Sequence, residues 1–195
     1  MKPLNKKRSW KPGTMIYPIP AVLVTCGSSV GESNMFTVAW VGTINTDPAM
    51  CYISVRPERH SYGIIKEQME FTINLTTADM TRQTDWAGVR SGKEYDKWKE
   101  TGLTPAPGVA VGCPYIDESP LSIECKVTSI LPLGSHHMFI AKVVNVLADE
   151  RYIDTDTDRF DLGKAGLLNY THGHYYSQGE ELGRFGFSVK KNKKD

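Results

Sequence analysis

The residues best suited to chemistry in this sequence form the short segment Arg56-Pro57-Glu58-Arg59-His60-Ser61. Guanidinium groups present planar forks of donors that fit a phosphate or a carboxylate. A helix that begins near Ser61 would add unpaired backbone N–H groups to the same corner. A single Arg or His in such a place is more often a solvated turn residue. The whole cluster, at the junction of a strand and a helix, favours an anion-binding site.

A second candidate anion site lies near Arg90. Ser91 and Glu94 have the spacing of a capping box, and Gly102 suits the end of a helix, so we expect a helix over residues 91–102. Its first turn would offer free N–H groups beside Arg90.

The first site requires a strand that ends and a helix that begins, and the flanking sequence predicts both. Residues 36–44 and 49–55 are rich in β-branched and aromatic side chains and flank a turn, which indicates a β-hairpin. Pro57 ends the second strand, and Ser61 begins a short helix that runs to Glu67. Small side chains share one face of the first strand, where a flat ring or another backbone could come close: Thr37, Ala39, Val41 and Thr43.

The rest of the chain predicts mostly strands. We expect further strands at 19–26, 71–75, 121–131 and 138–147, and a helix at 76–86. Residues 121–131 alternate between apolar and polar side chains, as a half-exposed strand does. Residues 138–147 are apolar on both faces, as in a strand that is buried in a barrel or between two subunits.

Length and charge favour a single domain that does not bind nucleic acid in general. The chain has 195 residues and a formal net charge of +1. No apolar run approaches the ~20 residues of a membrane helix, and no signal peptide is visible, so we expect no membrane partner and a cytoplasmic location. We divide the chain into an extended segment at 1–18, one domain at 19–185 and a basic tail at 186–195 that includes Lys190 to Lys194.

The cysteines and histidines do not indicate a disulfide, a nucleophile or a metal site. The four cysteines are scattered without a C-x-x-C pair, which predicts reduced core thiols: Cys26, Cys51, Cys113 and Cys125. His172 and His174 lack a third ligand nearby, so we expect no metal. His60, His137 and His172 are candidates for proton transfer that the sequence cannot rank, and the catalytic residue is unknown.

Several motifs, in their order and spacing, resemble the flavin reductase-like family and within it the flavoredoxin branch. They are Asn34-x-x-Thr37-x-x-Trp40, Asp47-Pro48, Ser54-Val55-Arg56-Pro57 with Arg59-His60-Ser61, Phe71 to Leu75, Ser91-Gly92 with Asp96-Lys97-Trp98, and Thr101 to Pro105. The resemblance spans roughly residues 15–185. It implies a mainly β protein with short helices, a split β-barrel of one domain that forms a homodimer and holds FMN. The segment Trp86-Ala87-Gly88 departs from the family pattern and leaves the shape of that loop open.

The resemblance also implies the residues that bind the cofactor. The FMN phosphate is expected near the arginines and the ring against the strand ends, with these residues in contact: Asn34, Thr37, Trp40, Thr43, Ser54, Val55, Arg56, Arg59, His60, Ser61, Asn74, Leu75, Arg90, Ser91, Gly92, Lys97 and Trp98. For Asn74, satisfaction by a neighbouring loop is an equally good reading. Tyr95 and Trp98 fit core anchors as well as a cofactor loop.

The function implied is that of an FMN-binding oxidoreductase. It would pass reducing equivalents through the flavin from NAD(P)H, or from another small-molecule or protein donor, to an acceptor. The alternative is a non-enzymatic FMN-binding electron carrier or a flavin storage protein.

Overall fold

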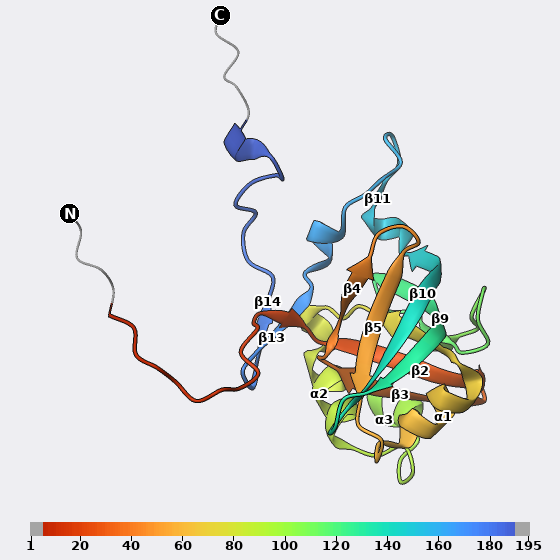
Figure 1. The fold of residues 1–195 in the computed structure, drawn as a ribbon. Helices are drawn as coiled ribbons and strands as arrows, with labels where there is room; N and C mark the ends of the chain where they lie inside the picture. The colour runs from red at the N-terminus through yellow and green to blue at the C-terminus, as the bar shows by residue number, and fades with distance from the viewer. Residues whose placement is uncertain (1–5, 190–195) are drawn as a thin grey trace, which may run out of the picture.

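The fold is organised by one antiparallel sheet of seven strands. The computed structural model describes residues 6–189, and the strand order in the sheet is β3-β2-β6-β9-β10-β5-β4 (Figure 1). The strands are β2 (Val22–Ser29), β3 (Glu32–Val38), β4 (Val41–Asn45), β5 (Met50–Val55), β6 (Glu70–Asn74), β9 (Leu121–Pro132) and β10 (His137–Ala148). Five of the six predicted strands are present, with ends displaced by up to a few residues, and the sixth, at 36–44, is divided between β3 and β4.

One predicted strand is divided in the structure. Residues 36–44 do not run as one strand, because the chain bends at Ala39 and Trp40. Before the bend β3 pairs with β2, and after it β4 pairs with β5, so the chain passes from one edge of the sheet to the other. The chain crosses between the two edges within this bend, and the amide of Ser54 donates to the carbonyl of Trp40 at 2.8 Å, which extends the β4–β5 ladder back to it. The sheet therefore curls toward a barrel without a continuous ladder at the join, which agrees with the predicted split barrel.

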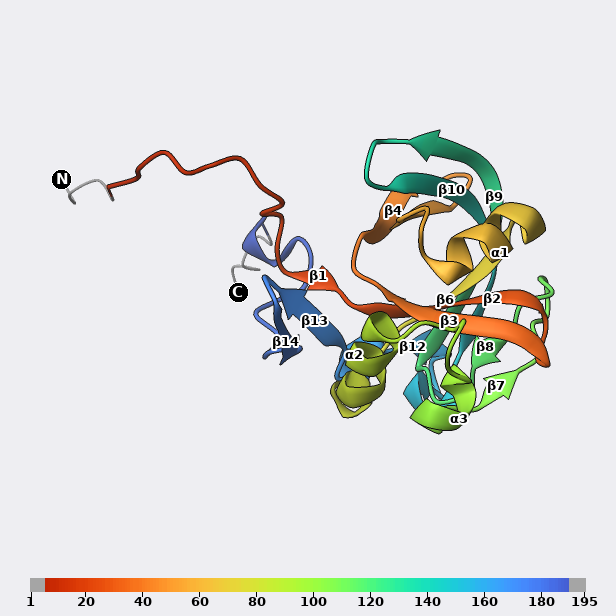
Figure 2. The same cartoon turned by 90° about the horizontal axis from the view of Figure 1, so that it is seen from below.

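Three α-helices cover the strands β2 and β3 from two sides (Figure 2). They are α1 (His60–Gln68), α2 (Thr81–Val89), which follows the 3₁₀ turn η1 (Ala78–Met80), and α3 (Lys97–Thr101). On one side Ile65 of α1 joins the core with Val24 and Phe36, and on the other Ala87 of α2 packs with Leu23. None of the described helices is long and apolar enough to cross a membrane.

The helix predicted over residues 91–102 is shorter than expected. It begins at Lys97 because Asp96 caps it, accepting hydrogen bonds from the amides of the next turn at 3.1 and 3.3 Å. The predicted cap, Ser91, instead begins a turn in which its carbonyl accepts two amides at 3.1 Å. Gly102 ends the helix as predicted, in the left-handed conformation with φ of 69°.

The predicted half-exposed strand is more buried than its alternating pattern indicates. On β9 the polar side chains of Ser122 and Glu124 are 2% and 0% exposed. The loop after β7 covers Glu124, and its amides at Val109 and Ala110 donate to the carboxylate at 2.7 and 2.9 Å, whereas the Oγ of Ser122 donates to Asn74 at 2.8 Å. Glu124 therefore fastens this loop to the sheet.

This role of Glu124 leads to a prediction on stability. In Glu124→Gln the new NH₂ group is a donor that would face other donors, namely the backbone amides of the loop and the Nδ2 of Asn145. That Nδ2 now donates to the carboxylate at 2.9 Å. We expect a loss of about 1–2 kcal/mol in the free energy of unfolding, the scale of a buried donor left without an acceptor. Urea denaturation measures it, with Glu67→Gln at an exposed carboxylate of α1 as the control. Equal effects of the two substitutions would contradict this role.

Short elements complete the fold. A three-stranded sheet joins β1 (Ile19–Pro20), β13 (Leu168–Thr171) and β14 (His174–Ser177), and two ladders join β7 (Pro105–Ala106) to β8 (Tyr115–Ile116) and β11 (Ile153–Asp154) to β12 (Arg159–Phe160). The 3₁₀ turns are η2 (Glu150–Tyr152), η3 (Leu162–Ala165) and η4 (Phe187–Val189). All four cysteines are buried and free.

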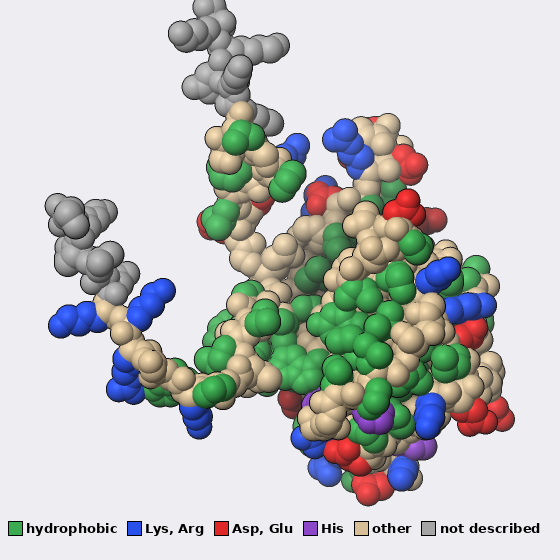
Figure 3. Space-filling model, viewed as in Figure 1, with side chains coloured by type: hydrophobic (Ala, Val, Ile, Leu, Met, Phe, Trp, Pro, Cys, Tyr) green, Lys and Arg blue, Asp and Glu red, His purple; other side chains and the backbone are tan. Residues whose placement is uncertain are grey.

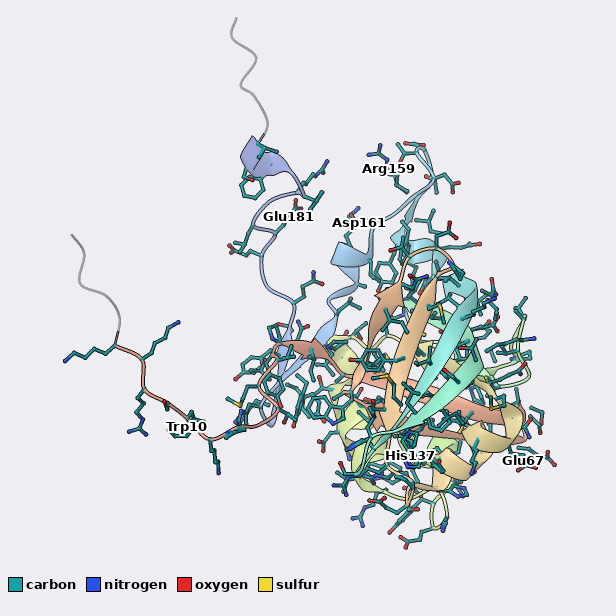
Figure 4. All side chains as sticks on the ribbon, in the orientation of Figure 1. Trp10, Glu67, His137, Arg159, Asp161 and Glu181 are labelled. Atoms are coloured by element: carbon teal, nitrogen blue, oxygen red, sulfur yellow. The ribbon has the colours of Figure 1, made fainter. Side chains whose placement is uncertain are left out.

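Two arms extend away from the body of the molecule (Figure 1). We call residues 6–18 the N-terminal arm and residues 178–189 the C-terminal arm. Trp10 on the first arm points away from the body (Figure 4), and Leu182 on the second is also exposed. The basic residues predicted at 190–194 lie outside the described residues.

Candidate functional site

A pocket of about 260 Å³ opens where β3, the start of α1 and the end of α2 meet, and we call it the corner pocket. It brings the two anion sites that the sequence predicted separately into one place. The residues that line it are Asn34, Phe36, Thr37, Arg56, Glu58, Arg59, His60, Ser61, Ala87, Gly88, Arg90, Ser91, Gly92 and Lys97.

The start of α1 forms one wall of the corner pocket. Arg59 is the N-cap residue and makes no side-chain capping bond, and the first turn carries no acidic residue. Within the described residues no acceptor is found for the amides of His60 and Ser61. Unpaired amides at a helix start favour an anion, because the helix dipole adds a positive potential there.

The cations around this wall differ in how far they are already neutralised. Arg56 is paired with Glu58 at 2.9 Å. Arg59 makes no ion pair within the described residues, and Arg90 lies over the ring of Tyr95 at 5.5 Å. The charge available to an anion in the pocket therefore comes mainly from Arg59, Arg90 and Lys97.

Lys97 is a buried amine at the back of the pocket. Its side chain is 4% exposed, and its Nζ donates to the carbonyl of Ala87 at 2.6 Å, near the end of α2. Burial, and next the charge of Arg59, lower the pKa of Lys97 to about 8, although Cys26 opposes the shift. Burial also lowers the pKa of His60, and the positive charges of Lys93 and Lys97 lower it further.

Asn34 links β3 to the start of α1. Its Nδ2 donates to the Oγ of Ser61 at 2.7 Å, while its Oδ1 accepts no hydrogen bond from the described residues. A Cβ at Gly92 would lie 2.3 Å from that Oδ1, so only glycine fits beside it. Asn34 lines the pocket, so its Oδ1 offers an acceptor for a bound ligand.

Some pocket residues were not singled out from the sequence. Phe36 was seen only as part of the predicted strand at 36–44, and Glu58 only as part of the charged segment. Ala87, which is 1% exposed, lies in the segment that departs from the family pattern. Gly88 lies in the segment that departs from the family pattern. A Cβ there would lie 3.1 Å from the Cβ of Thr37, so Gly88 lets α2 approach β3 closely.

A second pocket adjoins the first, and we call it the side pocket. It has a volume of about 680 Å³ and shares Asn34, His60, Gly92 and Lys97 with the corner pocket. Trp98 forms part of its wall, where its Nε1 donates to the Oγ of Ser33 at 3.0 Å. The shared residues place the two pockets next to each other.

The remaining predicted site residues lie elsewhere. Neither pocket is lined by Trp40, Thr43, Ser54, Val55, Asn74 or Leu75. Val55 points into the core, whereas Ser54 is half-buried on the other face of β5 and Thr43 is exposed on β4.

Asn74 is a correction to the expectation that a flavin satisfies it. It is fully buried, and its Nδ2 donates to the carbonyl of Leu23 at 3.0 Å. Its Oδ1 accepts from the amide of Ile116 at 2.9 Å and from the Oγ of Ser122 at 2.8 Å. The structure agrees with the alternative interpretation, in which protein groups near Asn74 satisfy its side chain.

The candidates for proton transfer are separated in space. Only His60 lines the corner pocket. His137 shares a hydrogen bond of 2.7 Å with Tyr62, and His172 lies against the ring of Tyr17. Among residues 6–189 no group of three or more His, Cys, Asp or Glu side chains could hold a metal ion.

Comparison with known proteins agrees with the fold and the motifs. The family described as "Flavin reductase like domain" matches residues 14–179. The flavoredoxin of Desulfovibrio vulgaris (Miyazaki F) is 31% identical, with a TM-score of 0.86 over 95% of this chain and 100% of that one. The flavoredoxin of Methanosarcina acetivorans is 25% identical, with a TM-score of 0.84 over the same shares. An FMN-binding protein of Thermus thermophilus is 22% identical, with a TM-score of 0.76 over 93% of this chain and 99% of that one.

Proposed function

The chain belongs to the flavin reductase-like family, in its flavoredoxin branch, and we propose that it is an FMN-binding oxidoreductase. Bound FMN would supply the redox chemistry, passing reducing equivalents from NAD(P)H or another donor to an acceptor. The observation that carries the proposal is the corner pocket, where free amides and unneutralised cations converge on one wall.

The residues present fit the phosphate of FMN. Arg59 and Arg90 supply charge, and the amides of His60 and Ser61 supply donors that nothing else in the described chain uses. Lys97 stands behind them as a further donor. An FMN-binding protein among the structural relatives, that of Thermus thermophilus, supports the choice of this flavin.

The size of the pocket supports a site that is shared between two chains. Ligand pockets commonly measure about 300–1,000 Å³. The corner pocket, at about 260 Å³, is smaller than that range, whereas the side pocket adds about 680 Å³ beside it. We propose that the corner pocket holds the phosphate end and that the rest of the cofactor lies in the adjoining space and against a second protomer.

The proposed activity is tested on the purified protein. A flavin absorbance spectrum, with FMN identified by mass spectrometry after heat release, would support the cofactor. Steady oxidation of NADH or NADPH with added flavin would support the enzyme. Tight FMN without that turnover would identify a carrier or a storage protein instead, and absence of any flavin affinity would contradict the proposal.

The pKa of Lys97 predicts how FMN affinity depends on pH. A bound phosphate would raise this pKa from about 8, so binding takes up a proton once the free amine is neutral. The affinity for FMN is then highest and constant below pH 8. Above pH 8 the association constant falls, approaching a tenfold loss per pH unit. Fluorescence titrations between pH 7 and 9 measure it, with riboflavin as the control ligand without phosphate. Equal pH dependence for both ligands would contradict the role of Lys97.

We also propose that the protein is a homodimer. The outer face of β4, β5 and β10 carries apolar side chains that are only partly covered, and Figure 3 shows hydrophobic side chains gathered over these strands. Ile44 is 46% exposed there, and Tyr52, Met138 and Ile140 are half-buried. Such a face favours association with its own copy.

Sedimentation tests the dimer. We expect a species of twice 21.8 kDa at micromolar concentration, and Ile140→Glu should weaken the dimer at least tenfold because it buries an unpaired carboxylate. Val109→Glu, on an exposed loop, is the matched control. A wild-type monomer would contradict this proposal.

The four free cysteines support a reducing compartment, and we propose a cytoplasmic location.

A further inference from the structure

A large acidic cavity lies apart from the corner pocket and shares no residue with it. Its volume is about 1,170 Å³, and η1, the loop before β9, the end of β10 and η2 surround it. Its walls carry the carboxylates of Asp79, Asp117, Glu118, Asp149 and Glu150 against the single guanidinium of Arg151, a net charge of −4. Buried apolar side chains, among them Met80 and Leu103, form part of the lining.

The N-terminal arm has the opposite charge and a matching apolar content. Residues 6–18 contain Lys6, Lys7, Arg8 and Lys11 and no acidic residue, a net charge of +4. Trp10 and Ile16 are 66% and 86% exposed. The arm makes no hydrogen bond to the rest of the described chain, and in Figure 3 its lysine and arginine side chains project from it into open space.

We infer that the N-terminal arm of one protomer docks into the acidic cavity of a second copy of this chain. The inference rests on the proposed homodimer. Tyr17 holds the base of the arm, with its ring 6.1 Å from Tyr170 and 5.6 Å from His172. From there the 11 residues 6–16 can reach ~36 Å when extended, enough to cross to a neighbouring protomer. The cations meet the carboxylates at the cavity wall, and Trp10 packs on its apolar lining.

Cross-linking between isotopically distinct copies tests where the arm lies. Full-length protein labelled with ¹⁵N is mixed with unlabelled protein, and a carbodiimide joins lysines directly to neighbouring carboxylates. We expect peptides that link residues 6–11 of one isotope to Asp117, Glu118 or Glu150 of the other. Links that occur only within one isotope, or none to these acids, would overturn the inference.

Charge exchange tests the same contact by affinity. Lys7→Glu with Arg8→Glu and Lys11→Glu should weaken the dimer at least tenfold at 0.1 M salt, and so should Asp79→Lys with Asp117→Lys and Glu150→Lys. Both sets in one chain should restore the dimer to within threefold of wild type, which also shows that the variants fold. An unchanged dimer in the single sets would overturn the docking while leaving the homodimer intact. A wild-type monomer would overturn both.

Discussion

Replacing Arg59 by alanine is expected to weaken FMN binding by about 1.5–3 kcal/mol, or about 10- to 150-fold. Arg59 is the N-cap of α1, it is solvent-accessible at the corner pocket, and no carboxylate among the described residues neutralises it. Its guanidinium is therefore available to a phosphate at the two free amides of the helix start. Fluorescence titration of the variant with FMN measures the loss.

Two comparisons show whether the lost contact is with the phosphate. Riboflavin, which lacks the phosphate, should bind the Arg59→Ala variant almost as it binds the wild type. Arg56→Ala removes the same charge from a residue that already pairs with Glu58 at 2.9 Å, so its effect should be smaller. If riboflavin and FMN lose affinity equally, the phosphate lies elsewhere and the role of this wall in the proposed function fails.

The parts of the fold that the sequence predicted well are those set by local chemistry. The hairpin around residues 45–48 and the helix that begins beside Ser61 follow from turn residues, a proline and hydrophobic spacing, all within a few residues of one another. The cationic corner could be predicted for the same reason. Arg56, Arg59, His60 and Ser61 are neighbours in sequence and stay neighbours in the corner pocket.

The parts that were wrong depend on partners far away in the sequence. For Asn74 the sequence left a flavin and a neighbouring loop equally open, and the partners are Ile116 and Ser122, more than 40 residues away, which no local pattern could select. The alternation of apolar and polar side chains predicted that Glu124 faces solvent. This pattern carries no information on a loop that folds over the strand. Ser91 was predicted to cap a helix, but the helix begins five residues later, because Asp96 is its N-cap.

The union of the two predicted anion sites also rests on a long-range contact. Arg59 and Arg90 lie 31 positions apart in the sequence. No local pattern in either segment predicts that they line the same pocket. The structure brings them together through Asn34, which bonds to Ser61 on one side and contacts Gly92 on the other. We therefore expect this three-residue link to control the shape of the pocket.

Replacing Gly92 by alanine is expected to reduce FMN affinity by about 1–3 kcal/mol, or about 5- to 150-fold, the cost of overpacking a filled site. The new Cβ would lie 2.3 Å from the Oδ1 and 2.7 Å from the Cγ of Asn34. Asn34 is 7% exposed and bonded to Ser61, so its amide can move only by leaving that bond. The displaced amide then disturbs the helix start where the phosphate is proposed to bind.

A double-mutant cycle with Asn34→Ala separates this cause from general damage. In the Asn34→Ala background the side chain that collides with the new Cβ is absent, so adding Gly92→Ala should change FMN affinity less than threefold. Gly63→Ala makes the same chemical change at an exposed position of α1 with no atom within 4 Å, and it should leave affinity unchanged. If Gly92→Ala costs as much in the Asn34→Ala background as in the wild type, the contact between these two residues does not shape the pocket. Thermal denaturation of each variant, run beside the titrations, shows whether the fold itself is kept.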